Sequence, residues 1–187
     1  MLMLKWLQRS KYFKKLTYHT IMKKDLHHLF QKLTHGVYVV GVYYNEEYNA
    51  FTASWVMQVS FSPLLLGLSI NPNHSSYESL IKGGVFTINV LPKGSLDLAE
   101  WFGQPKNNGT KLAEVDWRHG KTNAPILDDA MAYFECKFSH NCEAGDHQLI
   151  IGEVISGAVQ QPHALPMNYR ETGNMDESLK LFPEDFI

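Results

Sequence analysis

Apolar and polar residues alternate with a period of two along residues 130–142, and this alternation is typical of a half-buried β-strand. Residues 36–44 are rich in β-branched and aromatic residues, which also favour a strand. One segment, residues 64–71, is almost wholly apolar and predicts a strand buried on both faces. The predicted strands span residues 36–44, 49–61, 64–71, 85–91, 130–142 and 148–159.

Short helices are predicted between some of these strands from their end signals. Ser75 and Glu78 have the spacing of a capping box, and Gly83 and Gly84 would end the helix that follows. Asp25 would cap an earlier helix that ends before the first strand. The predicted helices lie within residues 25–36, 72–84, 93–103 and 110–116.

The order of these elements favours a mainly β protein with short helices. Strand follows strand without a regular βαβ rhythm, so an antiparallel barrel is favoured over a doubly wound parallel sheet. The glycine-rich dinucleotide fingerprint does not occur in the sequence. A nicotinamide nucleotide would therefore have to bind without a Rossmann crevice.

Composition narrows the class of protein further. The 187 residues fit one domain, and 44% hydrophobic with 19% charged residues is a globular profile. No segment approaches the roughly 18 uninterrupted apolar residues of a spanning helix, so no transmembrane segment is predicted. Two cysteines do not form a disulfide framework, which favours a reducing compartment and a cytoplasmic location.

Charge is distributed unevenly along the chain. Residues 1–24 hold seven of the seventeen basic residues and no acid, so we expect a basic N-terminal extension there. Residues 25–187 hold ten basic residues against nineteen acids, and residues 175–187 are expected to be an acidic C-terminal tail. An acidic body argues against nucleic-acid binding as the main function.

Two polar segments could bind a cofactor. Asn49, Thr52 and Ser54 lie among alanines on an otherwise bulky strand, and small residues let a ligand approach the backbone. The alternative is an ordinary strand with a solvent-facing side. His74 and Ser75 precede a predicted helix start, where free N–H groups and a positive charge on His74 would suit a phosphate. The alternative is a capped helix without a ligand.

Histidine and cysteine gather later in the chain. Alternation from Phe134 to Cys142 predicts that Cys136, His140 and Cys142 share one face. Zinc is possible in principle, but no Cys-x-x-Cys knuckle occurs and cysteines among phenylalanines more often pack as small apolar residues, so we expect no metal. Gly145, Asp146 and His147 could form a simple turn, or Asp146 could orient the imidazole.

Four segments together resemble the flavin reductase-like family, whose members have the FMN-binding split β-barrel, an antiparallel, Greek-key-like fold. The resemblance runs from about Gly36 to Asn174 and is especially close to the C-terminal flavin reductase domain of cyanobacterial diflavin flavoproteins, here expected as a stand-alone domain over residues 25–174. The segments are TASWVMQVSFSPLLLGLSI (52–70), SSYESLIKGGVFTINVL (75–91), PILDDAMAYFECKF (125–138) and GDHQLIIGEV (145–154).

The resemblance implies roles for individual residues. It implies that Asp146 and His147 take part in catalysis, with His147 orienting the nicotinamide and Asp146 fixing its tautomer. It implies a flavin site along two strands and at one helix start, with the C-terminal segment folding back near it. The implied cofactor-binding residues are Thr52, Ala53, Ser54, Trp55, Ser69, Ile70, Asn71, Ser75, Ser76, Tyr77, Gly145, His147, Tyr169 and Arg170. Asn49 is added to them from the polar, small-residue strand described above.

The resemblance also implies an activity. Family members bind FMN, with FAD as the alternative flavin, and pass a hydride from NADH or NADPH to it. Reduced flavin then passes electrons to an acceptor or a partner protein, and a homodimer is expected. A non-catalytic FMN-binding or electron-relay protein is the alternative, and a split barrel that binds another ligand such as haem is a third.

Overall fold

A computed structural model describes residues 26–105, 111–173 and 175–183. The basic extension at residues 1–24 and residues 184–187 of the acidic tail therefore lie outside the described residues. Contacts divide the chain into two units. In the smaller one, α1 (Leu26–Phe30) and the 3₁₀ turn η4 (Ser178–Leu181) each form one short helical segment. There the ring of Phe30 lies 5.9 Å from that of Phe182. Residues 34–177 form the larger unit.

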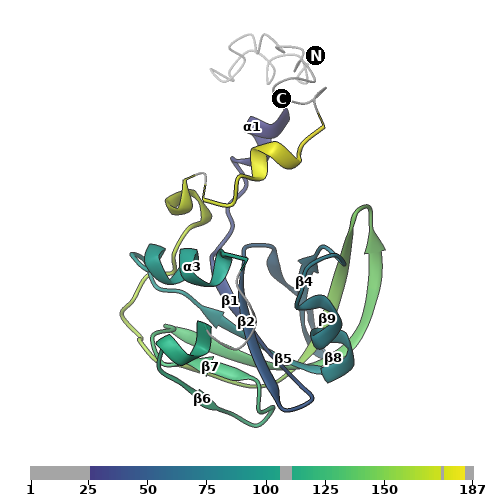
Figure 1. The fold of residues 1–187 in the computed structure, drawn as a ribbon, viewed down its shortest axis with the longest axis vertical. Helices are drawn as coiled ribbons and strands as arrows, with labels where there is room; N and C mark the ends of the chain where they lie inside the picture. Colours follow the sequence, from purple (N-terminus) through teal and green to yellow (C-terminus); the bar gives the residue numbers. More distant parts are fainter. Residues whose placement is uncertain (1–25, 106–110, 174, 184–187) are drawn as a thin grey trace, which may run out of the picture. The chain divides into compact units, whose positions relative to one another are not determined.

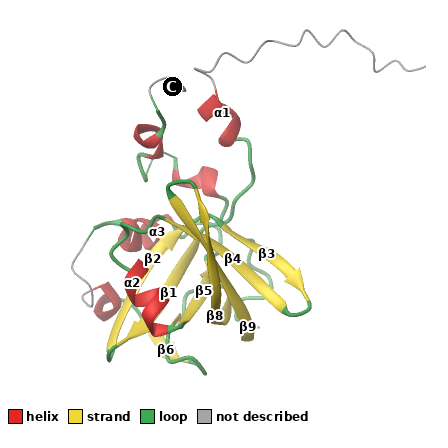
Figure 2. Cartoon of the chain, turned by 90° about the vertical axis from the view of Figure 1, so that its right-hand side faces the viewer, coloured by secondary structure: helices red, strands yellow, loops and turns green. Residues whose placement is uncertain are grey.

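The larger unit is built on one antiparallel sheet of seven strands (Figures 1 and 2). Its spatial order is β2-β1-β5-β8-β9-β4-β3, and each neighbouring pair is antiparallel. The strands are β1 (Tyr38–Tyr44), β2 (Glu47–Ala53), β3 (Val56–Phe61), β4 (Leu64–Ile70), β5 (Val85–Val90), β8 (Ala132–Ala144) and β9 (His147–Val159). This confirms the predicted antiparallel, mainly β class.

The predicted strand 49–61 is in fact two strands. It breaks at Ser54 and Trp55, and the resulting β2 and β3 lie at opposite edges of the sheet. Six strand spacings would separate those edges by roughly 29 Å in a flat sheet, whereas a two-residue link spans only about 10 Å. The sheet must therefore curl until its edges approach each other, which makes it a split barrel.

Two-residue turns set the register of two hairpins. Asn45 and Glu46 both have positive φ, as a type I′ turn requires. Strand β2 therefore begins at Glu47, before the predicted start at residue 49. Gly145 has φ of 69° and, with Asp146, joins β8 to β9, whose strands form the long hairpin at the right of Figure 1. The predicted sharp turn at Gly145 is confirmed.

A register shift in β8 corrects the predicted face of its polar residues. Phe138 pairs with Gly152, but His140 pairs with Ile151, because one extra residue enters β8 between them. Gly152 and Ile151 are adjacent on β9 and so face opposite ways. His140 and Cys142 consequently lie on the face opposite Phe138 and are exposed, not aligned with the buried Cys136.

The helices cover the two sides of β1. α2 (Tyr77–Gly83) packs on β1 and β5, and α3 (Leu96–Gly103) packs on β1 and β2. Gly84 ends α2 with φ of 67°, as predicted. The predicted capping box is wrong, because Ser76 rather than Ser75 is the N-cap and its side chain makes no capping bond. Short 3₁₀ turns follow at η2 (Lys111–Glu114) and η3 (Tyr169–Thr172).

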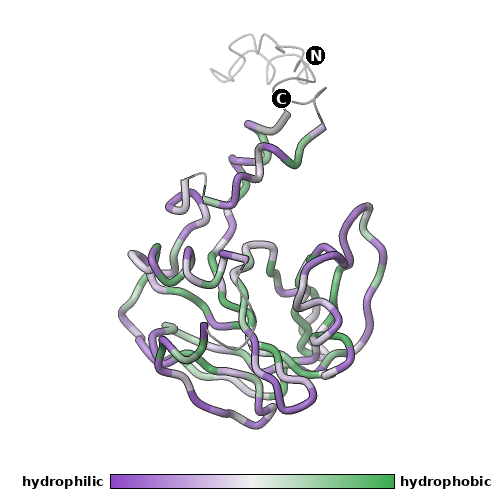
Figure 3. The backbone as a smooth tube through the Cα atoms, viewed as in Figure 1, coloured by the Kyte–Doolittle hydropathy of each residue, from purple (hydrophilic) through white to green (hydrophobic). Residues whose placement is uncertain are grey.

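Among the described residues, two apolar clusters form the core. Figure 3 shows the hydropathy of each residue along the backbone, with hydrophobic residues in green. One cluster fills the barrel and includes Val40, Leu68 and Phe86. The other lies between the opposite face of β1 and α3, and includes Val39 and Phe102. Strand β1 is therefore buried on both faces. β4 has consecutive buried residues from Leu66 to Leu68, as its apolar sequence predicted.

Two three-residue strands were not predicted from the sequence. β6 (Trp117–His119) pairs with β7 (Pro125–Leu127), and Asn89 of β5 anchors that pair to the main sheet. The Asn89 side chain accepts from the Leu127 N–H at 2.9 Å and donates to the Pro125 carbonyl at 3.2 Å. A buried amide with both ends satisfied holds this hairpin against the barrel.

Candidate functional site

A cavity of about 660 Å³ opens at the end of β2. Its wall includes Thr52, Ala53 and Ser54, and therefore lies where β2 breaks away toward β3. The C-terminal end of α3 and the segment around η3 supply further parts of the wall. The volume lies within the range of small-molecule and cofactor sites. The small-residue stretch predicted to admit a ligand thus borders a cavity.

Thr52 fixes the position of α3 against this wall. Its hydroxyl donates to the Ala99 carbonyl at 2.7 Å, so the end of β2 is tied to the middle of α3. Gly103, at the end of α3, also lines the cavity and contributes no side chain to this wall.

His74 lines the cavity from the segment before α2. Its ring centroid lies 4.5 Å from that of Phe51, and its Nδ1 accepts the Ser76 N–H at 3.2 Å. Burial lowers the pKa of His74, and the positive charge of Lys111 lowers it further. Both effects favour the uncharged form of the imidazole, which counts against the positive charge considered for a phosphate at this position.

Asn49 and Ser76 connect β2 to the start of α2. Both are buried, and the Asn49 amide donates to the Ser76 hydroxyl at 2.7 Å. The Asn49 oxygen accepts the Ala50 N–H at 2.8 Å. Neither residue is among those that line the cavity. They hold its wall in place, while Ser75 is exposed and Tyr77 packs against the barrel core.

Trp55, the residue directly after Ser54, makes two contacts beside the cavity wall. The Trp55 carbonyl accepts the Ser69 N–H at 3.0 Å, which ties the break between β2 and β3 to the end of β4. The Trp55 ring then lies against the His147 imidazole, with centroids 5.0 Å apart. Residues from the starts of β3 and β9 and the end of β4 thus meet beside the cavity wall.

His147 is held by a second contact. Its Nδ1 lies 2.9 Å from Asp146 Oδ1, and its side chain is only 21% exposed, against 86% for Asp146. The hydrogen bond from His147, and then its charge, lower the pKa of the Asp146 carboxyl. Nδ1 of His147 contacts Asp146, and its ring packs against Trp55. Nε2 is therefore the ring nitrogen that can contact a ligand.

The remaining predicted residues divide between these places. Tyr169 lines the cavity and its hydroxyl donates to the Asp176 carboxylate, while Arg170 is exposed and is not among the lining residues. Ile70 is buried beside Gln148, and Asn71 accepts the Asn73 N–H at 2.9 Å in the turn before α2. Neither of these last two is a lining residue.

Sequence reasoning missed one side of the cavity. Glu100 lines it from α3, Gln104 directly after α3, and Thr172 from η3. A local signal existed for η3. Asn168 forms a complete capping box with Glu171, accepting the Arg170 N–H at 3.0 Å.

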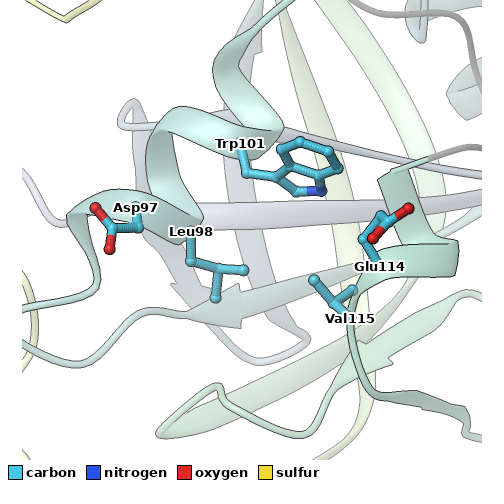
Figure 4. A pocket seen from close by; sticks show the side chains of 5 residues that line it. All are labelled: Asp97, Leu98, Trp101, Glu114 and Val115. Carbon is cyan, nitrogen blue, oxygen red and sulfur yellow. The ribbon is translucent and has the colours of Figure 1, made fainter.

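Another pocket, of about 390 Å³, lies between α3 and the end of η2 (Figure 4). Trp101 and Leu98 face Val115 across it, with Asp97 and Glu114 beside them. None of the predicted site residues lies there.

The described residues contain no group of three or more metal-ligating side chains. Cys136 is buried, and burial raises the pKa of its thiol to about 12, whereas Cys142 is exposed. Within the same described ranges, no helix has both the length and the apolar character that crossing a membrane requires.

Comparison with known proteins defines the class. The model of the flavin reductase like domain family matches residues 30–176, and the chain belongs to this family. The predicted family is therefore confirmed.

Individual relatives carry flavin-related names. A Rhizobium meliloti protein named "Probable flavin reductase" is 40% identical over 106 residues, covering 57% of this chain and 33% of that protein. Diflavin flavoprotein A 1 of Synechocystis sp. is 26% identical over 82% of this chain. The chain spans a third or less of the length of these two relatives.

A solved structure shares the fold. The NADH:FAD oxidoreductase SgcE6 of Streptomyces globisporus, in complex with NAD and FAD fragments, superposes with a TM-score of 0.71. It is 29% identical, and the match covers 76% of this chain and 85% of that chain.

Proposed function

We propose that this protein is an NAD(P)H-dependent flavin oxidoreductase that binds FMN in the cavity at the end of β2. The observation that carries the proposal is the position of His147. It contacts Trp55, the residue directly after the cavity-lining Ser54. A flavin in the cavity would therefore lie next to a histidine whose Nε2 edge is available. The family and the name of the NADH:FAD oxidoreductase add support.

The flavin, when bound, supplies the hydride-accepting chemistry. The protein's own residues would bind the flavin and orient it. Backbone and small side chains at Thr52, Ala53 and Ser54 would line the ring system. Ser69, Ile70 and Asn71 are proposed along the ribityl side, and Ser75, Ser76 and Tyr77 at the phosphate. Tyr169 and Arg170 are proposed at the edge of the site.

His147 is proposed to orient the nicotinamide. Its Nδ1–H would donate to Asp146, which keeps the Nε2 edge as the contact for the nicotinamide amide group. Gly145 allows the hairpin turn that sets His147 at the start of β9. Holding the two rings face to face at near-attack distance is the contribution that positioning makes to such a reaction.

The test mixes purified protein with FMN and either NADH or NADPH, and follows the absorbance of the reduced nicotinamide. We expect oxidation that depends on flavin and protein. FMN binding without oxidation of either nucleotide would contradict the reductase and favour an electron-relay protein. A Soret band without a flavin spectrum would favour haem. Mass measurement of the released cofactor distinguishes FMN from FAD.

We also propose a homodimer, with a cytoplasmic location and a separate electron acceptor. Strand β3 is an edge strand that exposes Met57, Val59 and Phe61, the last at 88%. An exposed apolar edge of this kind requires a covering partner to avoid aggregation. Phe61→Lys should halve the mass in solution, measured by light scattering, whereas Leu165→Lys, on an exposed loop, should leave it unchanged.

A further inference from the structure

His74 is the residue by which the segment before α2 reaches the cavity. The neighbouring Ser75, Ser76 and Tyr77 are not among the lining residues. The backbone of His74 is fixed on both sides. Its N–H donates to the Asn71 carbonyl at 2.9 Å, and its carbonyl accepts the Tyr77 N–H at 2.9 Å. The imidazole is therefore positioned before any ligand arrives, and binding would cost little ordering entropy.

The hydrogen bond to Ser76 fixes the tautomer. Nδ1 accepts the Ser76 N–H at 3.2 Å, and a ring nitrogen that accepts carries no proton. In the uncharged imidazole the proton is then on Nε2, which becomes a donor. Phe51 packs against the ring at 4.5 Å, and the Nδ1 edge is turned to α2. The Nε2 edge is the part left to line the cavity.

The surroundings keep this donor uncharged. Burial lowers the pKa of His74, and the ammonium group of Lys111 lowers it further. Lys111 is itself buried and held, because its Nζ donates to the Phe102 carbonyl at 3.0 Å and to the Gln104 carbonyl. A neutral donor makes directional hydrogen bonds to oxygen without placing a second positive charge beside Lys111.

We propose that His74 is a flavin-binding residue whose Nε2–H donates a hydrogen bond to an acceptor oxygen of the flavin. This inference rests on the proposed function, because it takes the cavity as the flavin site. It gives His74 two separate roles. Nδ1 holds the start of α2, and Nε2 contacts the ligand.

Two amide substitutions separate these roles. The side-chain nitrogen of Gln can occupy the place of Nε2 and donate to the ligand, whereas the shorter Asn can place its oxygen near Nδ1 and accept the Ser76 N–H. FMN affinity is measured by fluorescence titration for the unaltered protein, His74→Gln and His74→Asn. Thermal unfolding without ligand is measured for all three.

We expect His74→Gln to bind FMN within about threefold of the unaltered protein, and His74→Asn to bind about five- to tenfold more weakly, the value of one lost hydrogen bond. Thermal stability should follow the opposite order. If His74→Asn binds FMN as tightly as His74→Gln or more tightly, the inference is overturned and only the role at α2 remains. If the unaltered protein binds no FMN, the proposed function fails, and the inference with it.

Discussion

The rings of Trp55 and His147 lie with their centroids 5.0 Å apart, tilted by 47°. Trp55 leads into the edge strand β3 and His147 begins β9, and these two strands lie on either side of β4 in the sheet. Their contact exists because the end of β4 pairs with both neighbours: the Ser69 N–H donates to the Trp55 carbonyl, and Ile70 pairs with Gln148, the residue after His147. It connects the cavity wall, which ends at Ser54, with the histidine that we assign to the nicotinamide.

Replacing His147 should separate nucleotide use from flavin binding. We expect His147→Ala to raise the KM for NADH by about tenfold, the value of one well-placed hydrogen bond, because the Nε2 contact is lost. FMN affinity should change little, because His147 is not among the residues that line the cavity. Steady-state kinetics and FMN titration check this. His140→Ala, in the exposed part of the preceding strand, is the matched control. Equal losses of NADH and FMN binding would contradict the assignment.

We expect Trp55 to affect the use of NADH indirectly, by holding His147 in position. Trp55→Ala removes the ring that packs on the imidazole, and an aromatic pair of this kind contributes about 0.5–1.5 kcal/mol. We therefore expect the KM for NADH to rise about three- to tenfold, and Trp55→Phe to restore most of it. Met57→Ala removes another exposed apolar side chain from β3 and controls for a general effect on that strand. A Phe variant as impaired as the Ala variant would count against ring packing as the cause.

Local patterns were sufficient to predict most of the barrel. Alternation, β-branched content and the apolar run at 64–71 located the strands, and the positive φ of Gly145 is a requirement that glycine meets without strain. The break at Ser54 and Trp55 could not be predicted in this way, because residues 49–61 contain neither a proline nor a glycine to mark the end of a strand. The break is set by partners elsewhere in the chain, since β2 pairs with β1, whereas β3 and the Trp55 carbonyl pair with β4.

The sequence likewise predicted only some of the residues that line the cavity. Thr52, Ala53, Ser54 and Tyr169, which the family resemblance implied to be cofactor-binding residues, line the cavity. Glu100 and Gln104 could not be found, because the helix that carries them is placed by tertiary contacts such as the bond from Thr52 to Ala99. The sequence also could not show that burial and Lys111 favour the uncharged form of His74, since neither is visible in a local pattern.

The two cysteines should differ sharply in reactivity. The thiolate is the reactive form, and burial raises the pKa of Cys136 to about 12, so it stays a protonated thiol at pH 8. Cys142 is exposed and should be alkylated by iodoacetamide within minutes. Mass spectrometry of the native protein should show one modification, and two after unfolding. Native modification at Cys136 would show that the barrel opens.

The raised pKa of Cys136 predicts that the folded protein loses stability as the pH rises above about 9. Its pKa is raised in the folded state, so the folded protein retains a proton that the unfolded chain loses above about pH 9. The contribution to stability is complete below that pH and falls as the pH rises toward 12. Cys136→Ala should therefore reduce the loss of stability between pH 9 and 10 in urea unfolding. An identical pH dependence in the variant would contradict this origin.

Asn49 should contribute to stability and, through it, to flavin binding. Asn49→Ala removes the amide that bonds Ser76 at 2.7 Å and the Ala50 N–H at 2.8 Å, and leaves both partners buried. Buried groups without partners cost about 1–3 kcal/mol, so urea unfolding should show a loss of that size. Because Ser76 begins α2, loosening this contact should also displace His74 and weaken FMN binding. Asn73→Ala, in the exposed turn before α2, should leave both quantities unchanged. A stable Asn49→Ala variant with weakened FMN binding would instead indicate that Asn49 contacts the flavin directly.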